Sequence, residues 1–352
     1  MAALVAYRGL TLSDNIDDYP EGIILPVDKP YRWTSADVIR KVKYLAIKHF
    51  HKKNLKVGHA GTLDPLATGV LLVCIGKATK LAEELQASPK QYLAGVTFGA
   101  TTPSYDLEKE IDRLCPLDGV SEAALRSVLP DFVGEQDQVA PLFSAKSVDG
   151  VRAYETARRL FKQGLPVDAS DLLQASRITI YDLEVMSYSS AGMGSENASL
   201  RSAPPIASNG SPPLMLPRVA QFSDPIPAPG TTTGHDAEGD TDSEGTAADQ
   251  STPFAQSLSS TRVAQSSGPR PAQGEENSRN GRIHVADVSG YDLPTALVRV
   301  DCSKGTYIRA LARDLGEALG SGAFLSSLRR TRNGGISVSD ALTLDDAVAL
   351  LQ

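Results

Sequence analysis

One acidic residue, Asp64, is followed directly by a proline within a run of small and apolar residues, GHAGTLDPLATGV at 58–70. Pro65 fixes its own φ and disfavours the helical conformation for Asp64. The glycines of the run permit backbone geometry that other residues forbid, so we expect a stiff loop that displays one carboxylate. A carboxylate with an ordinary pKa of about 3.9 is ionised at neutral pH and can act as a nucleophile without a dedicated base. An aspartate before proline is also a common helix N-cap, and these residues alone leave both interpretations open.

Five segments of the chain carry motifs that follow one another along nearly the whole sequence. They are PVDKP at 26–30 with Thr34-Ser35, GHAGTLDPLATGVLLVCIGKATK at 58–80, KQY at 90–92, DCSKGTYIR at 301–309 and LRRTR at 328–332. Together they resemble the TruB family of tRNA pseudouridine synthases, in which a G-x-L-D-P-x-A-x-G loop carries a catalytic aspartate. The motifs occur in the family's order, which makes the resemblance far more specific than a single pattern.

The resemblance implies catalytic roles for Asp64, Tyr92 and Arg309. Asp64 would act either at C1′ of the sugar or at the base, and the sequence leaves these routes open. Arg309 would grip the carboxylate through two parallel hydrogen bonds and keep it charged. Tyr92 would stack on a flipped-out base near its C5 proton. Without the resemblance, we would interpret Arg309 as a surface arginine and Tyr92 as a core tyrosine.

The resemblance also implies contacts with the substrate. The predicted substrate- and RNA-binding residues are His59, Lys29, Pro30, Lys80, Leu328, Arg329 and Arg330. Lys29 and Pro30 would shape the floor of the pocket, and Leu328 would form an apolar wall. Arg329 and Arg330 would contact phosphates, and Lys80 a phosphate or the pocket. His59 would push into the RNA, although a loop histidine without a partner would look the same.

The function implied by the resemblance is the isomerisation of uridine to pseudouridine at position 55 in the T loop of tRNA. The N1–C1′ bond of a flipped-out base would break with the help of Asp64, and the base would rejoin the sugar through C5. We expect tRNA, bound through its T-arm, as the partner, and no cofactor, metal, membrane, obligatory protein partner or guide RNA. The alternatives are a guide-RNA-dependent relative of the dyskerin type and a non-catalytic tRNA-folding protein.

Composition is typical of a cytosolic globular protein. The 352 residues are 41% hydrophobic and 22% charged, which suffices for one large domain or two modest ones. No apolar run is long enough to span a bilayer, and the first residues lack the pattern of a secretory signal. Three widely spaced cysteines without a CxxC pair argue against a zinc site and a disulfide framework. We therefore expect a cytoplasmic location.

Low-complexity sequence marks one long insert. Residues 189–281 are rich in Ser, Pro, Gly, Thr and Ala and cannot bury enough apolar surface to offset their ordering entropy, so we expect disorder. Loop closure becomes only slowly more costly with length. The insert is therefore expected to interrupt one catalytic domain, formed by residues 1–188 and 282–352. Within it, residues 134–164 resemble the family's mobile thumb.

Charge is unevenly distributed. The net charge is -7, but residues 190–281 carry twice as many acids as bases. Two basic clusters lie elsewhere, at Arg40, Lys41, Lys43, Lys48, Lys52, Lys53 and Lys56 and at Arg152, Arg158, Arg159 and Lys162. Such clusters suit a phosphate backbone, although a solvated helix face has the same composition.

The pattern of apolar residues predicts a mixed fold. A capping box from Thr34 to Asp37 begins a helix that continues to Phe50, and the apolar run 70–75 indicates a buried strand. Further strands are predicted at 90–98, 177–187 and 295–302, the last two paired across the insert, and further helices at 121–129, 153–162, 306–319 and 345–351. The resemblance implies an α+β fold with a mixed, largely antiparallel sheet flanked by helices.

Three features depart from the family's usual bacterial pattern. Phe143 stands where a tyrosine is common, next to a run that is one residue short, and this concerns the thumb rather than the chemistry. The insert has no counterpart in the family pattern. The chain ends soon after Leu351, so we expect no C-terminal PUA-type RNA-binding domain and more reliance on the basic segment after Thr34.

Overall fold

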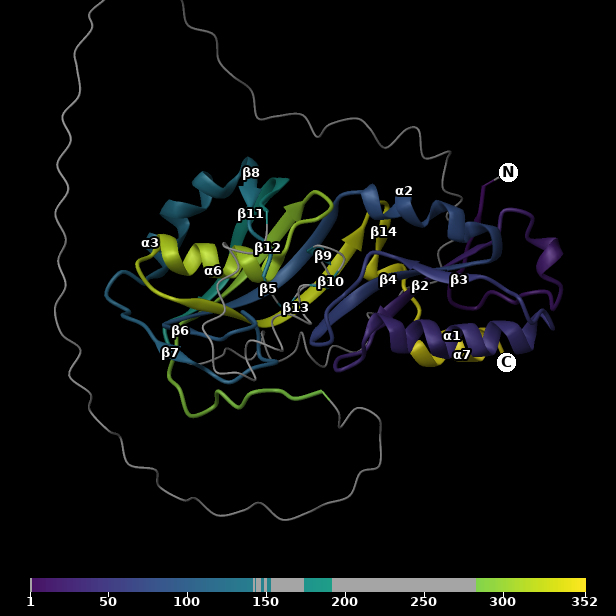
Figure 1. Ribbon diagram of the computed structural model, residues 1–352, viewed down its shortest axis with the longest axis horizontal. Coiled ribbons are helices and arrows are strands. Elements are labelled where there is room, and N and C mark those ends of the chain that lie inside the picture. The colour runs from purple at the N-terminus through teal and green to yellow at the C-terminus, as the bar shows by residue number, and fades with distance from the viewer. Residues whose placement is uncertain (1, 142, 144–146, 149–150, 153–173, 192–282) are drawn as a thin grey trace, which may run out of the picture. The chain divides into compact units, whose positions relative to one another are not determined.

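The computed structural model describes residues 2–141, 143, 147–148, 151–152, 174–191 and 283–352 (Figure 1). These residues belong to one unit, to which the chain contributes from both sides of the predicted insert. The predicted helix at 153–162, nearly all of the insert and more than half of the thumb-like segment lie outside the described residues. The division into domains therefore stays a prediction.

The described part of the chain contains a ten-stranded sheet, mixed but largely antiparallel, as the α+β prediction requires. The order is β1-β2-β4-β13-β5-β12-β11-β8, with β3 also paired to β4 and β14 to β13. Its strands are β1 (Leu4–Val5), β2 (Ile23–Lys29), β3 (Val57–Ala60), β4 (Ala67–Ile75), β5 (Lys90–Phe98), β8 (Gly134–Gln138), β11 (Ser176–Ser189), β12 (Thr295–Cys302), β13 (Ala323–Asn333) and β14 (Ile336–Ser337). Two short pairs lie apart from it, β6 (Ala100–Thr101) with β7 (Arg113–Leu114) and β9 (Ser147–Val148) with β10 (Val151–Arg152).

Helices flank this sheet (Figure 1). The α-helices are α1 (Ser35–His49), α2 (Ala82–Ala87), α3 (Glu122–Val128), α6 (Ile308–Ala318) and α7 (Leu344–Leu350), and the 3-10 helices are η1 (Ile16–Asp18), η2 (Gly76–Leu81), η3 (Leu129–Phe132) and η6 (Val338–Asp340). α1 and α7 contact each other and lie near β2 and β4, whereas α6 packs against β13 and β5 and contacts α3. None of the described helices is long and apolar enough to cross a membrane.

Local sequence signals predicted several of these elements correctly. Thr34 and Asp37 form the expected capping box, with both reciprocal hydrogen bonds present. β11 and β12 pair in antiparallel orientation across the insert, as predicted. α6 begins at Ile308, two residues later than predicted, because Gly305 adopts a φ of 83° and Thr306 Oγ1 donates to the carbonyl of Ser303.

The helix N-cap interpretation of Asp64 is wrong. Asp64 lies in the turn between β3 and β4, where the amide of Ala67 donates to its carbonyl oxygen at 3.1 Å. A strand, β4, follows this turn and is buried along its whole length. The alternative, a loop that displays a carboxylate, is the one that the structure contains.

Candidate active site

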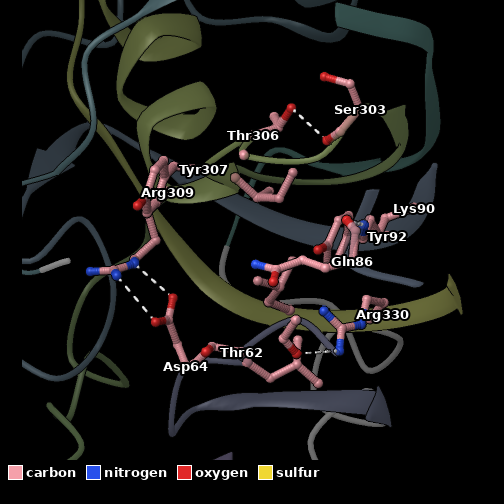
Figure 2. A pocket seen from close by; sticks show the side chains of 15 residues that line it. Thr62, Asp64, Gln86, Lys90, Tyr92, Ser303, Thr306, Tyr307, Arg309 and Arg330 are labelled. Carbon is pink, nitrogen blue, oxygen red and sulfur yellow. Dashed lines mark hydrogen bonds and ion pairs between the residues drawn. The ribbon is translucent and has the colours of Figure 1, made fainter. Parts of the chain in front are cut away.

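A cavity of about 240 Å³ lies where β5, β13, the turn after β3 and the start of α6 meet (Figure 2). This is smaller than the pockets of roughly 300–1,000 Å³ that hold drug-sized ligands, and it suits a single small ring. The lining residues are Gly61, Thr62, Leu63, Asp64, Gln86, Lys90, Tyr92, Ser303, Gly305, Thr306, Tyr307, Ile308, Arg309, Leu328 and Arg330. All three predicted catalytic residues are among them.

Asp64 and Arg309 form an ion pair at one end of this pocket (Figure 2). Nη2 of Arg309 donates to Oδ1 of Asp64 at 3.2 Å, and Nε lies 2.9 Å from Oδ2. The N–H of Nε is not aligned for a hydrogen bond, so this second contact is electrostatic. The Asp64 side chain is 38% exposed and that of Arg309 is 6% exposed. The carboxylate is therefore open to a ligand, and the cation is covered.

Backbone carbonyls and a second acid also contact the Arg309 guanidinium. Nη1 donates to the carbonyl of Ser104 at 3.1 Å and Nη2 to that of Phe143 at 2.9 Å. Nε also lies 3.7 Å from Oδ2 of Asp106. Burial alone would lower the pKa of Arg309, but the nearby carboxylates outweigh it and raise this pKa, so the guanidinium stays charged.

Asp106 is a carboxylate that the sequence analysis missed. Its side chain is buried, and its Oδ1 accepts from Ser104 Oγ at 2.6 Å and from the amide of Glu108 at 2.9 Å. Burial raises the pKa of Asp106, while Arg309 acts in the opposite direction. No periodicity marks this residue, because it lies in the irregular segment between β6 and β7. Its contacts allow it to orient Arg309.

Lys29 supports the turn that carries Asp64. Its buried ammonium donates to the carbonyls of Pro30 at 2.9 Å, Trp33 at 2.5 Å and Pro65 at 3.2 Å. Burial lowers the pKa of Lys29 to about 7, whereas Asp64 favours its charged form. Three carbonyl acceptors match the three N–H groups of an ammonium. Lys29 and Pro30 are not among the residues that line the pocket, and Lys29 contacts the turn that carries Asp64.

Tyr92 and Arg330 lie at the other end of the pocket, as directly paired residues of β5 and β13 (Figure 2). Both are buried, and burial raises the pKa of Tyr92 while Arg330 acts in the opposite direction. Arg330 donates to the carbonyls of Val70 at 2.7 Å and Gly61 at 3.0 Å. Leu328, two residues before Arg330 on the same strand, also lines the pocket.

The other predicted RNA contacts lie outside the pocket lining. Arg329 is buried, and its guanidinium pairs with Asp28 at 2.7 Å and donates to Thr68 Oγ1 at 3.2 Å, which argues against a phosphate contact. Lys80 is exposed on η2. His59 is half-buried on β3, and burial together with the charge of Arg330 lowers its pKa below the usual range.

Gln86, Lys90 and Tyr307 also line the pocket but were not predicted. Lys90 could have been found, because it precedes Tyr92 by two residues on one strand and therefore points to the same face. Tyr307 lies inside the GTYIR motif, and Gln138 holds its backbone through two hydrogen bonds. Within the described ranges, no group of His, Cys, Asp and Glu is arranged to hold a metal ion.

Comparison with known proteins identifies the family. The model of the TruB family pseudouridylate synthase N-terminal domain matches residues 48–201, and that of the tRNA pseudouridylate synthase B C-terminal domain matches residues 309–352. The tRNA pseudouridine synthase B of Phocaeicola vulgatus is 33% identical over 93% of this chain and 92% of its own length. That of Thermus thermophilus is 33% identical over 91% of this chain and 75% of its own length. The chain therefore belongs to the TruB family and is a pseudouridine synthase.

A solved structure also matches along the chain. It is a Cbf5-Nop10-Gar1 complex, whose matching chain is 20% identical with a TM-score of 0.47, and the match covers 99% of this chain and 63% of that one. The segment that the C-terminal family model matches contributes α6, β13, β14 and α7 here.

Proposed function

We propose that this enzyme converts uridine at position 55 in the T loop of tRNA to pseudouridine. The observation that carries the proposal is a partly exposed carboxylate, Asp64, held by a covered arginine in a pocket of one-ring size that Tyr92 also lines. The names of the relatives, tRNA pseudouridine synthase B, support tRNA as the substrate.

The target uridine has to leave its stack to reach this pocket. Flipping a nucleotide costs a few kcal/mol and costs least where the base is not held in a duplex, which favours a loop as the target. Inside the pocket, the ring of Tyr92 replaces the lost stacking. Because burial raises the pKa of Tyr92, its phenol is a poor base at neutral pH, and we assign it to stacking rather than to proton removal.

Asp64 starts the chemistry. When the N1–C1′ bond breaks, its electron pair goes to the base. In one route the ionised carboxylate bonds to the electron-poor C1′, and in the other it adds to the base and helps this bond to break. Arg309 fixes the direction of the carboxylate from its buried side. The base then turns, C5 bonds to C1′ as the bond to the carboxylate breaks, and the C5 proton leaves to water while N1 takes up a proton.

The exposed side of α1 and the turn after it provide a second contact for RNA. The cations exposed there are Arg40, Lys41, Lys43, Lys48, Lys52, Lys53 and Lys56. Of these, Arg40 and Lys52 have an acidic partner within the described residues. Tyr44 lies among them with 68% exposure, and an aromatic ring between cations is typical of nucleic-acid surfaces. We propose that tRNA is bound here without an obligatory protein or guide RNA, in the cytoplasm.

The test is the conversion of an unmodified tRNA transcript by the purified protein alone. Wild type should form pseudouridine at position 55, and a transcript with cytidine there should remain unchanged. Asp64→Asn should abolish conversion and keep RNA binding, because the amide has nearly the same shape but no charge. Conversion only with a guide RNA would favour the dyskerin-type alternative. Binding without conversion by wild type would favour a tRNA-folding protein.

A further inference from the structure

Two buried cations, Lys90 and Arg330, line the end of the pocket that lies across from the Asp64–Arg309 pair (Figure 2). Lys90 is 5% exposed and Arg330 is 1% exposed. Both lie beside Tyr92, since Lys90 is on the same face of β5 and Arg330 is its direct neighbour on β13. The two positive charges are close enough for Arg330 to lower the pKa of Lys90 in addition to the effect of burial.

Neither cation forms an ion pair with an acid in the part of the chain that the structure describes. Lys90 donates to the carbonyls of Gln86 and Ser88, and Arg330 to those of Val70 and Gly61. Two further titratable groups act on Lys90. Lys304 is a cation and adds to the positive charge, and Cys302 cannot compensate it, because burial raises the pKa of its thiol to about 12 and keeps it neutral.

The other buried arginines of this region are neutralised. Arg309 contacts Asp64 and Asp106, and Arg329 contacts Asp28. Carbonyl dipoles satisfy hydrogen bonds but do not cancel a charge, and an uncompensated buried charge is costly. Two such charges beside an open cavity therefore favour the binding of an anion there.

We propose that Lys90 and Arg330 form an anion subsite that holds the uracil ring while it is detached from the sugar. This inference rests on the proposed function. When the N1–C1′ bond breaks, its electron pair stays on the base, which becomes an anion with charge shared by N1, O2 and O4. The pair of the new C5–C1′ bond comes from that ring, which then loses the C5 proton to water while N1 gains a proton, so the product has the same atoms as the substrate. A ring that escaped would instead take a proton from water and leave as uracil, and water would add to C1′.

The surroundings favour a planar base over a phosphate as the ligand. The aromatic ring of Tyr92 lies directly beside both cations, and a planar anion can stack on it while its oxygens face the cations. A phosphate would have to bring the RNA backbone into a cavity of about 240 Å³. Positive donors also match the carbonyl oxygens of uracil and oppose the amino group of cytosine.

The experiment uses a T-arm RNA whose target uracil carries a radiolabel, with enzyme in excess. Wild type should give labelled pseudouridine and no free uracil. Lys90→Met, which keeps the length of the side chain, should slow conversion on the order of a hundredfold, as for the loss of one preorganised donor, and should release labelled uracil. Lys90→Arg should restore conversion and retain the label. Lys77→Met, at an exposed lysine outside the pocket, is the matched control.

A wild-type rate for Lys90→Met would overturn the proposal. So would weaker RNA binding with a normal rate at saturation and no free uracil, because this result would assign Lys90 to a phosphate. Slow conversion by the Lys90→Met variant without release of free uracil would overturn it as well, because this result would give Lys90 a merely structural role. Melting curves identify a variant that fails to fold, and Lys90→Gln then takes its place. Failure of wild type to convert the RNA would instead reject the proposed function itself.

Discussion

Arg309 holds Asp64 at 2.9 Å from a covered position, since its side chain is 6% exposed and that of Asp64 is 38% exposed. Asp106 and the carbonyls of Ser104 and Phe143 also contact this guanidinium, whose Nε and Nη2 are the atoms that face Asp64. A planar guanidinium can make these contacts at once, whereas an ammonium acts as a point charge. The direction of the Asp64 carboxylate therefore depends on residues outside the pocket lining.

Removing the guanidinium should destabilise the fold. Arg309→Met leaves Asp106 buried without its cation, so we expect the free energy of unfolding to fall by about 3–5 kcal/mol. Adding Asp106→Asn to this variant should recover part of the lost free energy of unfolding, because the buried, unpaired carboxylate is then replaced by a neutral amide. Arg177→Met is the control, since the ion pair of Arg177 with Glu135 is exposed and should contribute about 0–1 kcal/mol. Urea unfolding measures all four proteins, and equal losses for Arg309→Met and Arg177→Met would contradict the expectation.

Asp106→Asn should affect rate more than affinity. Asp106 does not line the pocket, but it contacts Arg309 and thereby the direction of Asp64. A misplacement of about 1 Å in a reacting group can cost on the order of a hundredfold in rate. We expect single-turnover conversion at saturating tRNA to slow by about that factor while the Kd for tRNA changes little. A variant that bound tRNA weakly but reacted at the wild-type rate would place Asp106 on the RNA instead.

Gly69 of β4 is paired with Arg330 of β13. Its φ is 101°, and a Cβ added there would lie 2.1 Å from the carbonyl oxygen of Arg330. Gly69→Ala should therefore combine left-handed strain of about 1–2 kcal/mol with overpacking of typically 1–3 kcal/mol. Gly9→Ala is the control, because Gly9 has a φ of 85° but nothing within 4 Å of an added Cβ. Thermal unfolding should separate the two variants, and an equal shift in Tm would show that strain alone matters.

Signals that act over a few residues predicted the elements well. The capping box at Thr34 begins α1, and the strand predicted at 90–98 coincides with β5. The order of the sheet could not be predicted in this way, because β13 lies between β4 and β5 through pairings that no local pattern encodes. Around Asp106 the backbone is irregular, so no periodic spacing of apolar residues indicated where this side chain would lie.

In the candidate site too, local sequence signals indicated some features, whereas contacts between distant residues could not be inferred from them. Asp64 and Arg309 are 245 positions apart, and their meeting could be expected only from the family resemblance. Arg329 and Arg330 look alike in sequence, yet successive residues of a strand point to opposite faces. One pairs with Asp28 and the other reaches the pocket. Lys90 went unpredicted although the alternation of β5 places it beside Tyr92.

Activity should fall as pH rises through about 8, because burial, aided by Arg330, lowers the pKa of Lys90 to about 8 and the proposed subsite needs its cation. The single-turnover rate at pH 9 should be about tenfold below that at pH 7. The contribution of Lys90 to stability changes with pH in the opposite direction to activity. Between about 8 and the unfolded value near 10.4, the unfolded chain binds more protons at this group, so its contribution to the free energy of unfolding rises with pH. A loss of activity between these pH values therefore cannot be caused by unfolding through the titration of Lys90.

Lys90→Arg separates this titration from that of Lys29, which contacts the Asp64 turn and whose pKa burial lowers to about 7. If Lys90 causes the alkaline decline, the arginine variant should keep its rate to higher pH. The other groups that bear on Lys90 are Arg330, Lys304 and Cys302, and the Cys302 thiol is neutral in this range. An unchanged decline in Lys90→Arg would assign the titration elsewhere.

Charge reversal on α1 should weaken the binding of whole tRNA without slowing the chemistry. Lys41→Glu, Lys43→Glu and Lys48→Glu together remove three exposed cations, none of which lines the pocket. Each lost phosphate contact should reduce the slope of log Kd against log salt by roughly 0.7–0.9, whereas the rate at saturating tRNA should stay the same. The control reverses Arg113, Arg126 and Arg177, which are exposed on β7, α3 and β11 and change the net charge equally. Long-range charge acts on both triple variants alike. A larger change in slope for the lysine variant would therefore show direct contact between α1 and RNA. Equal changes in slope would show that α1 is only a solvated helix face.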